Sequence, residues 1–137
     1  MSFETKIERI EIKNEADIIN ARVRTKILAE SLGFNYMDQT RIATAVSELA
    51  RNALEHAGGG QLTIEEVNLQ RKRGLQITAE DHGPGIENLD LALKGGYSTK
   101  GGLGLGLSGS KRLMDAFQVK TEVGRGTVVT AKKWLSR

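Results

Sequence analysis

At 137 residues, the chain is long enough to form one domain with a hydrophobic core and too short for two. Its net charge of +3 comes from basic residues interspersed with acids, which does not favour a nucleic-acid-binding face. Cysteine is absent, which excludes disulfides and thiolate metal sites, and no apolar run reaches the ~18 residues of a membrane span. We therefore expect a single cytoplasmic domain over residues 1–137, with neither nucleic acid nor membrane as a partner.

The first part of the chain predicts a strand followed by a helix. Charged and apolar residues alternate from Glu8 to Lys13, which is the period of a half-exposed strand. Asn14 is well placed to cap the next helix, and Gly33 is the expected end of that helix. Apolar residues at helical spacing form its expected buried stripe: Ala16, Ile19, Val23 and Ile27.

A second helix is predicted from Asp38 to about His56, which is read as a helix-end residue before the glycines at 58–60. At 100° per residue, Glu48 and Asn52 share a stripe at the flank of its buried face, one turn apart. A carboxylate and an amide placed this way can both point into one cleft, although a solvated helix side remains the alternative. The buried face itself holds apolar residues at helical spacing: Ile42, Val46, Leu49 and Ala53.

Two strands are predicted next, from Leu62 to Val67 and from Gly74 to Asp81, joined by the basic turn Arg71-Lys72-Arg73. Asp81 has the same parity as the apolar residues of its strand, so its carboxylate is aimed at the packed layer. A buried carboxylate needs a donor. A local backbone cap is one candidate, and an adenine amino group is the other, with Gly83 and Gly85 letting the base approach the backbone.

The remaining elements complete an α+β domain. A short helix over 89–93 precedes a polar, glycine-rich segment from 94 to 102, which has the composition of a mobile lid. A further helix is expected from about Gly104, with Leu107, Met114 and Phe117 on its buried face, followed by strands over 119–123 and 127–134. Since helices do not separate successive strands everywhere, we expect a two-layer sandwich: one mixed, mostly antiparallel sheet covered on one face by helices.

After the glycines that follow Asp81, a second glycine cluster runs from Gly101 to Gly109 and opens a helix, where free N–H groups and the helix dipole favour phosphate. Its segment Gly102-x-Gly-x-Gly106 matches neither the dinucleotide fingerprint G-x-G-x-x-G nor a P-loop. No H-R-D or D-F-G motif of a eukaryotic-type kinase occurs, and His56 and His82 are too far apart in sequence for a helical metal pair. The cluster alone therefore indicates only a phosphate cradle.

The order of these motifs is more specific than any one of them. Four features follow one another along the chain: a helix with Glu48 and Asn52, then Asp81-x-Gly-x-Gly85, then Gly102-x-Gly-x-Gly106, and a late Gly126-Thr127. This arrangement resembles the gyrase, Hsp90, histidine kinase and MutL family of ATP-binding domains, which have the Bergerat fold. Three sequence segments are similar to segments of the small bacterial anti-sigma-factor serine/threonine kinases, above all the switch kinases of stressosome signalling. They are Ala45-Val46-Ser47-Glu48-Leu49-Ala50-Arg51-Asn52, Gly101-Gly102-Leu103-Gly104 and Lys111-Arg112-Leu113-Met114-Asp115.

The resemblance implies roles for individual residues. Asn52 would ligate Mg²⁺, Asp81 would accept from the adenine amino group, and Thr127 would help to hold the base. Glu48 would act as the general base for in-line phosphoryl transfer. Lys100, in the lid, would reach the γ-phosphate. The remaining residues expected to contact ATP are Gly83, Gly85, Ile86, Gly101, Gly102, Leu103, Gly104, Leu105 and Gly106.

The resemblance also implies a function: a Mg-ATP-dependent kinase that phosphorylates serine or threonine on STAS-domain proteins, either anti-sigma factor antagonists or stressosome scaffold subunits. A PP2C-type phosphatase or a sigma factor is an expected binding partner, and a homodimer is an expected assembly. One alternative is a regulatory module that sequesters a sigma factor or switches on a phosphatase in response to nucleotide. Another is a bare ATPase in which Glu48 activates water.

Overall fold

The computed structural model describes residues 6–94 and 103–136. The order of elements agrees with the sequence prediction, strand–helix–helix–strand–strand–helix–helix–strand–strand. They are β1 (Ile7–Ile12), α1 (Glu15–Leu32), α2 (Tyr36–Ala57), β2 (Gly60–Leu69), β3 (Lys72–Asp81), α3 (Leu89–Lys94), α4 (Leu103–Leu113), β4 (Ala116–Glu122) and β5 (Gly126–Trp134). All of the predicted lid except its first residue, Lys94, lies outside the described residues.

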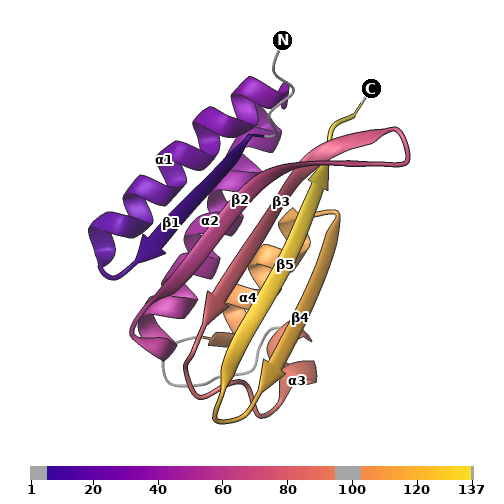
Figure 1. The fold of residues 1–137 in the computed structure, drawn as a ribbon. Helices are drawn as coiled ribbons and strands as arrows, with labels where there is room; N and C mark the ends of the chain where they lie inside the picture. The colour runs from indigo at the N-terminus through magenta and orange to yellow at the C-terminus, as the bar shows by residue number, and fades with distance from the viewer. Residues whose placement is uncertain (1–5, 95–102, 137) are drawn as a thin grey trace.

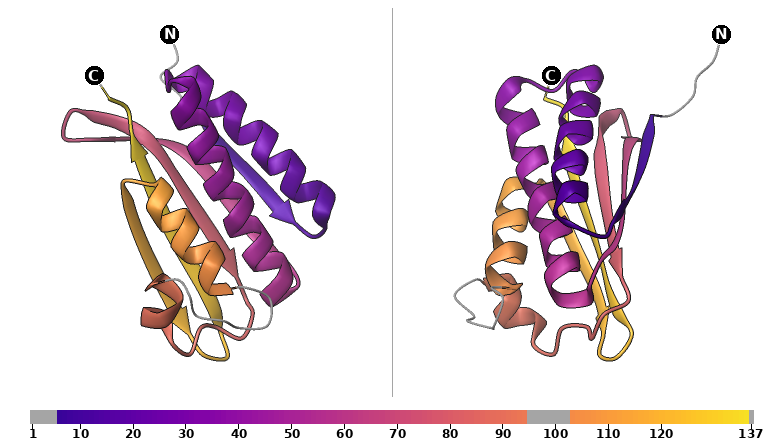
Figure 2. Two further views of the ribbon diagram at one scale, coloured as in Figure 1. Left: turned by 180° about the vertical axis from the view of Figure 1, so that it is seen from behind. Right: turned by 90° about the vertical axis from the view of Figure 1, so that its left-hand side faces the viewer.

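The described strands form one five-stranded sheet in the order β1-β2-β3-β5-β4. Each neighbouring pair runs antiparallel, so the mostly antiparallel sheet that we predicted has no parallel pair among these strands. Helices α1, α2 and α4 lie side by side on one face of the sheet, and the other face carries none of the helices in residues 6–94 and 103–136 (Figures 1 and 2). The α+β two-layer prediction is therefore confirmed.

Strand parity sorts the sheet residues as predicted. In β3, Leu75 and Ile77 are fully buried under the helices, while the alternate residues Gln76 and Thr78 are only partly covered. Asp81 continues the inward parity at the end of the strand, where it pairs in register with Thr127 of β5. The central strands thus place a carboxylate and a hydroxyl next to each other at the lower end of the helical layer.

The predicted buried stripe of α1 is wrong. Ile19, Val23 and Ile27 are 65%, 52% and 63% exposed. The buried face is the opposite one, made of Ile18, Ala21, Thr25, Leu28, Ala29 and Leu32. Because α1 carries apolar residues on both sides, spacing alone could not choose between them. The face with two alanines lets the helix axis approach its neighbours closely, and that face packs inward. The ends were predicted correctly: Asn14 caps the helix and Gly33 ends it with φ of 102°.

The expected face of α2 is confirmed, since Ile42, Val46, Leu49 and Ala53 are all buried. The helix begins at Tyr36 rather than Asp38, because Asn35 accepts a hydrogen bond from the N–H of Asp38 and acts as the cap. It ends at Ala57, with Gly58 in the left-handed conformation.

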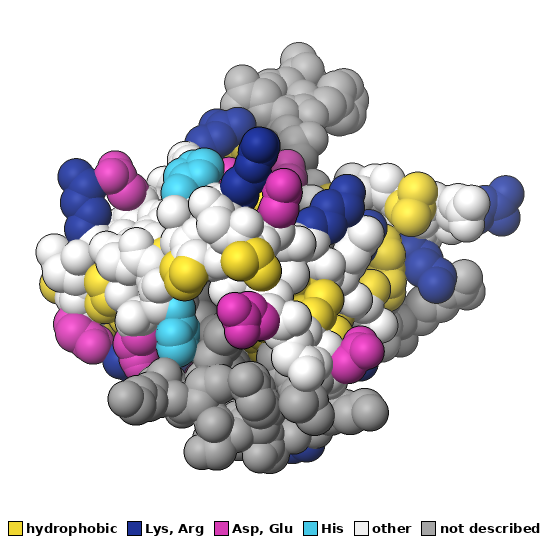
Figure 3. Space-filling view, turned by 90° about the horizontal axis from the view of Figure 1, so that it is seen from below, with side chains coloured by type: hydrophobic (Ala, Val, Ile, Leu, Met, Phe, Trp, Pro, Cys, Tyr) yellow, Lys and Arg dark blue, Asp and Glu magenta, His cyan; other side chains and the backbone are white. Residues whose placement is uncertain are grey.

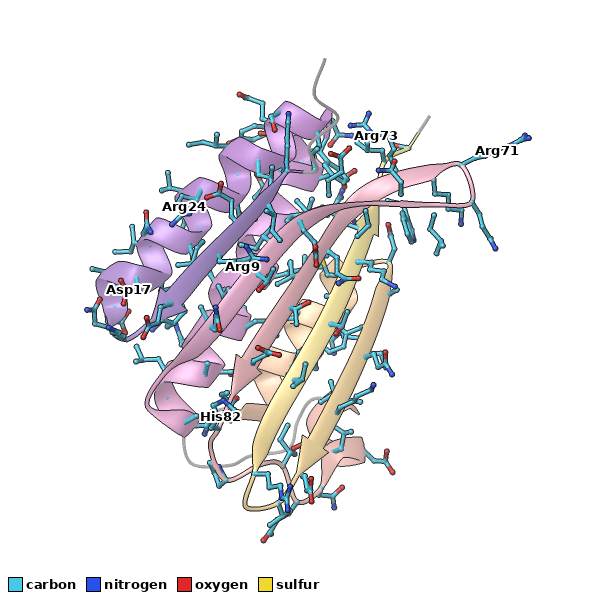
Figure 4. All side chains as sticks on the ribbon, in the orientation of Figure 1. Arg9, Asp17, Arg24, Arg71, Arg73 and His82 are labelled. Carbon is cyan, nitrogen blue, oxygen red and sulfur yellow. The ribbon has the colours of Figure 1, made fainter. Side chains whose placement is uncertain are left out.

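The β2–β3 hairpin is longer than predicted. Gln70 and Arg71 occupy its tip with φ of 49° and 70°, which matches the right-handed twist of the strands. Lys72 and Arg73 belong to β3, and Figure 4 shows Arg71 at the tip, pointing away from the sheet. The basic triplet is thus a turn followed by the start of a strand.

Phe117 is not part of α4, contrary to our prediction. The helix ends at Leu113, and β4 begins at Ala116, before the predicted start at Val119. Long-range pairing explains the change, because the N–H of Asp115 donates to the carbonyl of Lys132 at 2.8 Å and its carboxylate accepts from the N–H of Trp134 at 2.8 Å. Leu107 is buried in α4 as expected, and Met114 is buried but lies just past the end of the helix.

Within the described ranges, no helix is both long and apolar enough to cross a membrane.

Candidate nucleotide-binding site

A narrow cleft opens between α2, the ends of β3 and β5, the loop at 84–86 and the start of α4. Most of its wall is apolar, and a few polar side chains converge on it, as is typical of small-molecule sites. Its lining residues are Leu49, Asn52, Ala53, His56, Ala79, Asp81, Pro84, Gly85, Ile86, Leu107, Thr127 and Val129. The structure therefore brings together five residues that the sequence placed in a nucleotide site: Asn52, Asp81, Gly85, Ile86 and Thr127.

Asp81 has a local partner. Its Oδ1 accepts a hydrogen bond from the backbone N–H of Gly83 at 2.9 Å. The backbone cap that we considered as an alternative to a ligand is thus present. A carboxylate can accept several hydrogen bonds, so this cap leaves capacity for a second donor inside the cleft.

The glycines after Asp81 are required by protein packing. A Cβ on Gly83 would meet the Cβ of Ala57 at 2.5 Å, and one on Gly85 would meet the carbonyl oxygen of Glu122 at 2.5 Å. Gly85 also has φ of 79°, which strains other residues. The two glycines therefore let the loop lie directly against the end of α2 and the β4–β5 hairpin. That close approach forms one wall of the cleft.

Thr127 belongs to a small hydroxyl network. Its Oγ1 lies 2.9 Å from Oγ1 of Thr121, which in turn accepts the backbone N–H of Ile86 at 2.9 Å. Oγ1 of Thr121 also lies 3.2 Å from the carbonyl oxygen of Gly126. Thr127 is 8% exposed, so its hydroxyl is held in a fixed place on the cleft wall.

On α2, Asn52 lines the cleft, and its Nδ2 is buried without a hydrogen-bond partner among the described residues. Glu48 lies one turn earlier on the same helix and is half-buried, but it is not part of the cleft lining. The shared stripe predicted from sequence therefore places one of the two side chains in the cleft and the other beside it. The described residues contain no group of three or more His, Asp or Glu side chains that could hold a metal ion.

Arg51, next to Asn52, points the other way and joins α2 to α1. Its guanidinium donates to Glu15 at 2.9 Å. That hydrogen bond is the main cause that raises the pKa of Arg51 above its ordinary value, and the charges of Glu15, Glu55 and Glu48 raise it further. Glu48 therefore sits in the field of a permanent cation on the same helix.

The phosphate end is described only in part. Leu103, Gly104, Leu105 and Gly106 form the first turn of α4, where backbone N–H groups have no partner inside the helix. This is the position that our phosphate-cradle prediction requires. The predicted contacts at Lys100, Gly101 and Gly102 lie outside the described residues.

Sequence reasoning missed His56 as a cleft residue. The prediction made it a helix-end residue, and it is indeed in the last turn of α2, but it also lines the cleft. Helical spacing could have found it, because His56 falls on the same stripe as Leu49, Asn52 and Ala53. The other lining residues that were not predicted are Leu49, Ala53, Ala79, Pro84, Leu107 and Val129.

Comparison with known proteins gives the same picture. Residues 37–137 match the model of the histidine kinase-, DNA gyrase B- and HSP90-like ATPase family. The chain is 50% identical over 126 residues to the serine/threonine-protein kinase RsbT of Bacillus subtilis, covering 92% of this chain and 95% of that protein. It is 33% identical over 117 residues to an anti-sigma F factor of Clostridium kluyveri, covering 82% of each.

Among solved structures, the histidine kinase AdeS of Acinetobacter baumannii matches with a TM-score of 0.55 at 18% identity, covering 98% of this chain and 70% of that one. This likeness concerns the fold. The family match covers well over half of the chain and includes every cleft residue described above. The chain therefore belongs to the histidine kinase-, DNA gyrase B- and HSP90-like ATPase family.

Proposed function

We propose that this chain is an ATP-dependent protein serine/threonine kinase of a partner-switching stress pathway, acting in the cytoplasm on STAS-domain proteins. The observation that carries the proposal is the convergence of Asp81, Thr127 and Asn52 on one cleft, with Glu48 one turn away on the same helix. The similarity to the RsbT kinase over nearly the whole chain supports the same reaction.

Each side chain has a role that its position allows. Asp81 accepts from the adenine amino group, and Thr127 and Ile86 hold the base against the apolar wall. Asn52 fits a metal-bound phosphate because its buried amide lacks a partner, and its amide oxygen is a ligand that Mg²⁺ accepts. When bound, Mg²⁺ would supply charge neutralisation of the phosphates.

The first turn of α4 donates its free N–H groups to the phosphates. Glu48 takes the proton of the attacking serine or threonine hydroxyl. The hydroxyl oxygen then forms its bond to the γ-phosphorus as the bond to the ADP oxygen breaks. We further propose that Lys100, Gly101 and Gly102, which lie outside the described residues, contact the phosphates, with Lys100 assigned to the γ-phosphate.

The test is phosphoryl transfer by Glu48→Gln to a STAS-domain partner. We expect transfer to fall about 10²–10⁴-fold, because general-base catalysis contributes that much, while ADP binding is retained. Glu55→Gln is the matched control, since Glu55 is an exposed glutamate on the same helix. Transfer by Glu48→Gln at the wild-type rate would show that Glu48 is not the base.

The second candidate is a regulatory module that sequesters a sigma factor or activates a PP2C-type phosphatase, and the similarity to anti-sigma F factors favours it. Pull-downs with ATP and with ADP separate the two: nucleotide-gated binding without any phosphorylated partner supports the module. Phosphate release without an acceptor protein would instead indicate a bare ATPase. Light scattering with and without nucleotide tests the homodimer that we expect.

A further inference from the structure

Two buried polar side-chain atoms in the described part of the chain lack a hydrogen-bond partner, Nδ2 of Asn52 and Nε2 of His56. Both residues line the same cleft. An unpaired buried nitrogen destabilises a folded protein, so such atoms are rare unless a ligand or water completes them. Their occurrence together in one cleft points to a site that pairs both atoms with one ligand, rather than to two separate packing defects.

The two atoms mark different parts of the cleft. His56 lies one turn beyond Asn52 on α2, on the side away from Glu48, and one turn advances a helix by about 5.4 Å. The carbonyl oxygen of His56 would lie 3.2 Å from a Cβ on Gly83, so the turn after Asp81 packs against this end of α2. Along α2, Glu48 therefore lies beyond Asn52 on the transfer side, outside the cleft lining, and His56 lies at the Asp81 end of the cleft.

We propose that His56 is a nucleoside-recognition residue, whose Nε2 hydrogen-bonds the adenosine half of the bound nucleotide beside the contact made by Asp81. This inference rests on the proposed function, because it takes ATP as the occupant of the cleft. A neutral imidazole nitrogen is either a donor or an acceptor, depending on the tautomer. Adenine ring nitrogens and ribose hydroxyls complement both forms, whereas the phosphates belong to the Asn52 end.

The chain offers a matched control in its other histidine, His82. Both histidine side chains are visible at the lower end of the molecule in Figure 3. His82 is exposed just past the end of β3, where Figure 4 labels it, and it does not line the cleft. A general effect of removing an imidazole from this end would appear in both variants, and a specific contact only in His56.

The experiment measures the affinities of ADP, AMP and adenosine by calorimetry, together with the melting temperature of the ligand-free protein. His56→Phe keeps an aromatic ring and removes the ring nitrogens, and His56→Leu repeats the test with a smaller side chain. His56→Gln restores an N–H near the position of Nε2. We expect His56→Phe and His56→Leu to bind all three ligands roughly tenfold more weakly, His56→Gln to recover most of the loss, and His82→Ala to match wild type.

The melting temperature of the ligand-free protein gives an independent test of the proposal. Removing an unpaired buried nitrogen should leave the melting temperature of the ligand-free protein unchanged or higher, while a purely structural histidine would lower it when replaced. Wild-type affinity for ADP in His56→Phe and His56→Leu would overturn the proposal. A loss that appears with ADP but not with adenosine would also overturn it, because it would place the contact on phosphate. Failure of the wild-type protein to bind any nucleotide would instead refute the proposed function itself.

Discussion

Helices α1 and α2 are both long, both capped by asparagine and both ended by glycine, yet they use their apolar residues differently. The apolar residues of α2 concentrate on one face, which is buried, and the edge of that face carries Asn52 and His56 into the cleft. The apolar residues of α1 divide between a buried face and an exposed stripe formed by Ile19, Val23 and Ile27. In this molecule, the candidate site lies at the boundary of the core rather than on the most exposed apolar surface.

The largest expected effect separates the two faces of α1. Leu28 is 7% exposed and its neighbour Ile27 is 63% exposed, so they form a matched pair. Leu28→Ala should lower the free energy of unfolding by about 2–5 kcal/mol through the cavity that it leaves. Ile27→Ala should change it by less than about 0.5 kcal/mol. Urea unfolding measures both, and equal losses that depend on protein concentration would mean that a second copy covers the stripe.

A smaller effect compares the two N-terminal caps. Asn14 and Asp17 exchange hydrogen bonds at 3.0 and 3.2 Å, whereas the Asn35 cap of α2 is a single bond at 2.8 Å. Asn14→Ala should cost about 1 kcal/mol, and more than Asn35→Ala, because it breaks a reciprocal capping box. Thermal unfolding of the two variants decides the order. A greater loss in Asn35→Ala would show that the start of α2 depends more on its cap.

A weaker contribution comes from the ion pair that joins the helices. Arg51 and Glu15 have side chains that are 43% and 65% exposed, so the pair is screened by solvent. Arg51→Gln should cost at most about 1 kcal/mol, and the difference from wild type should shrink as salt is added. Unfolding curves at low and high salt test this. A loss that persists in high salt would indicate a packing role for the arginine stem.

The smallest expected effect concerns the exposed stripe. Val23→Lys should leave the free energy of unfolding within about 0.5 kcal/mol of wild type, since Val23 is 52% exposed. ADP affinity should not change, because the residue lies outside the cleft. Comparing this variant in unfolding, ADP binding and partner pull-down assays would show whether the stripe serves contacts outside the chain.

Much of the fold was predictable because local signals agreed with tertiary packing. Asn14, Gly33 and Gly58 indicated the helix ends, and strand parity indicated that Asp81 faces the helical layer. The face of α1 could not be predicted, because two faces of one helix are apolar and only packing against α2 and the sheet selects one. Phe117 was misplaced because helical spacing continues past Leu113, whereas the long-range hydrogen bonds of Asp115 with β5 end the helix.

Residue type and spacing pointed to Asn52 and Asp81 as candidate site residues, whereas Thr127 was expected only from the family resemblance. The apolar wall was not predictable, because residues such as Ala79 and Val129 have the same signature whether they face the core or a cleft. His56 was hidden for another reason: a histidine in the last turn of a helix already has a structural explanation. Only the unpaired Nε2 of His56 in the folded protein indicates an additional, ligand-binding role for this residue.

The threonine pair at the end of the sheet has a consequence for what the cleft can bind. The hydroxyl of Thr121 has one proton, which it can give either to the carbonyl oxygen of Gly126 or to Oγ1 of Thr127. In the first case Thr127 must donate to Thr121 and presents only lone pairs to the cleft. In the second case, Thr127 accepts from Thr121, and its own hydroxyl proton can be donated to an atom in the cleft. Concerted rotation of the two hydroxyls, with no movement of heavy atoms, therefore changes this wall from acceptor to donor, and a single protein surface can complement either kind of atom on a bound base.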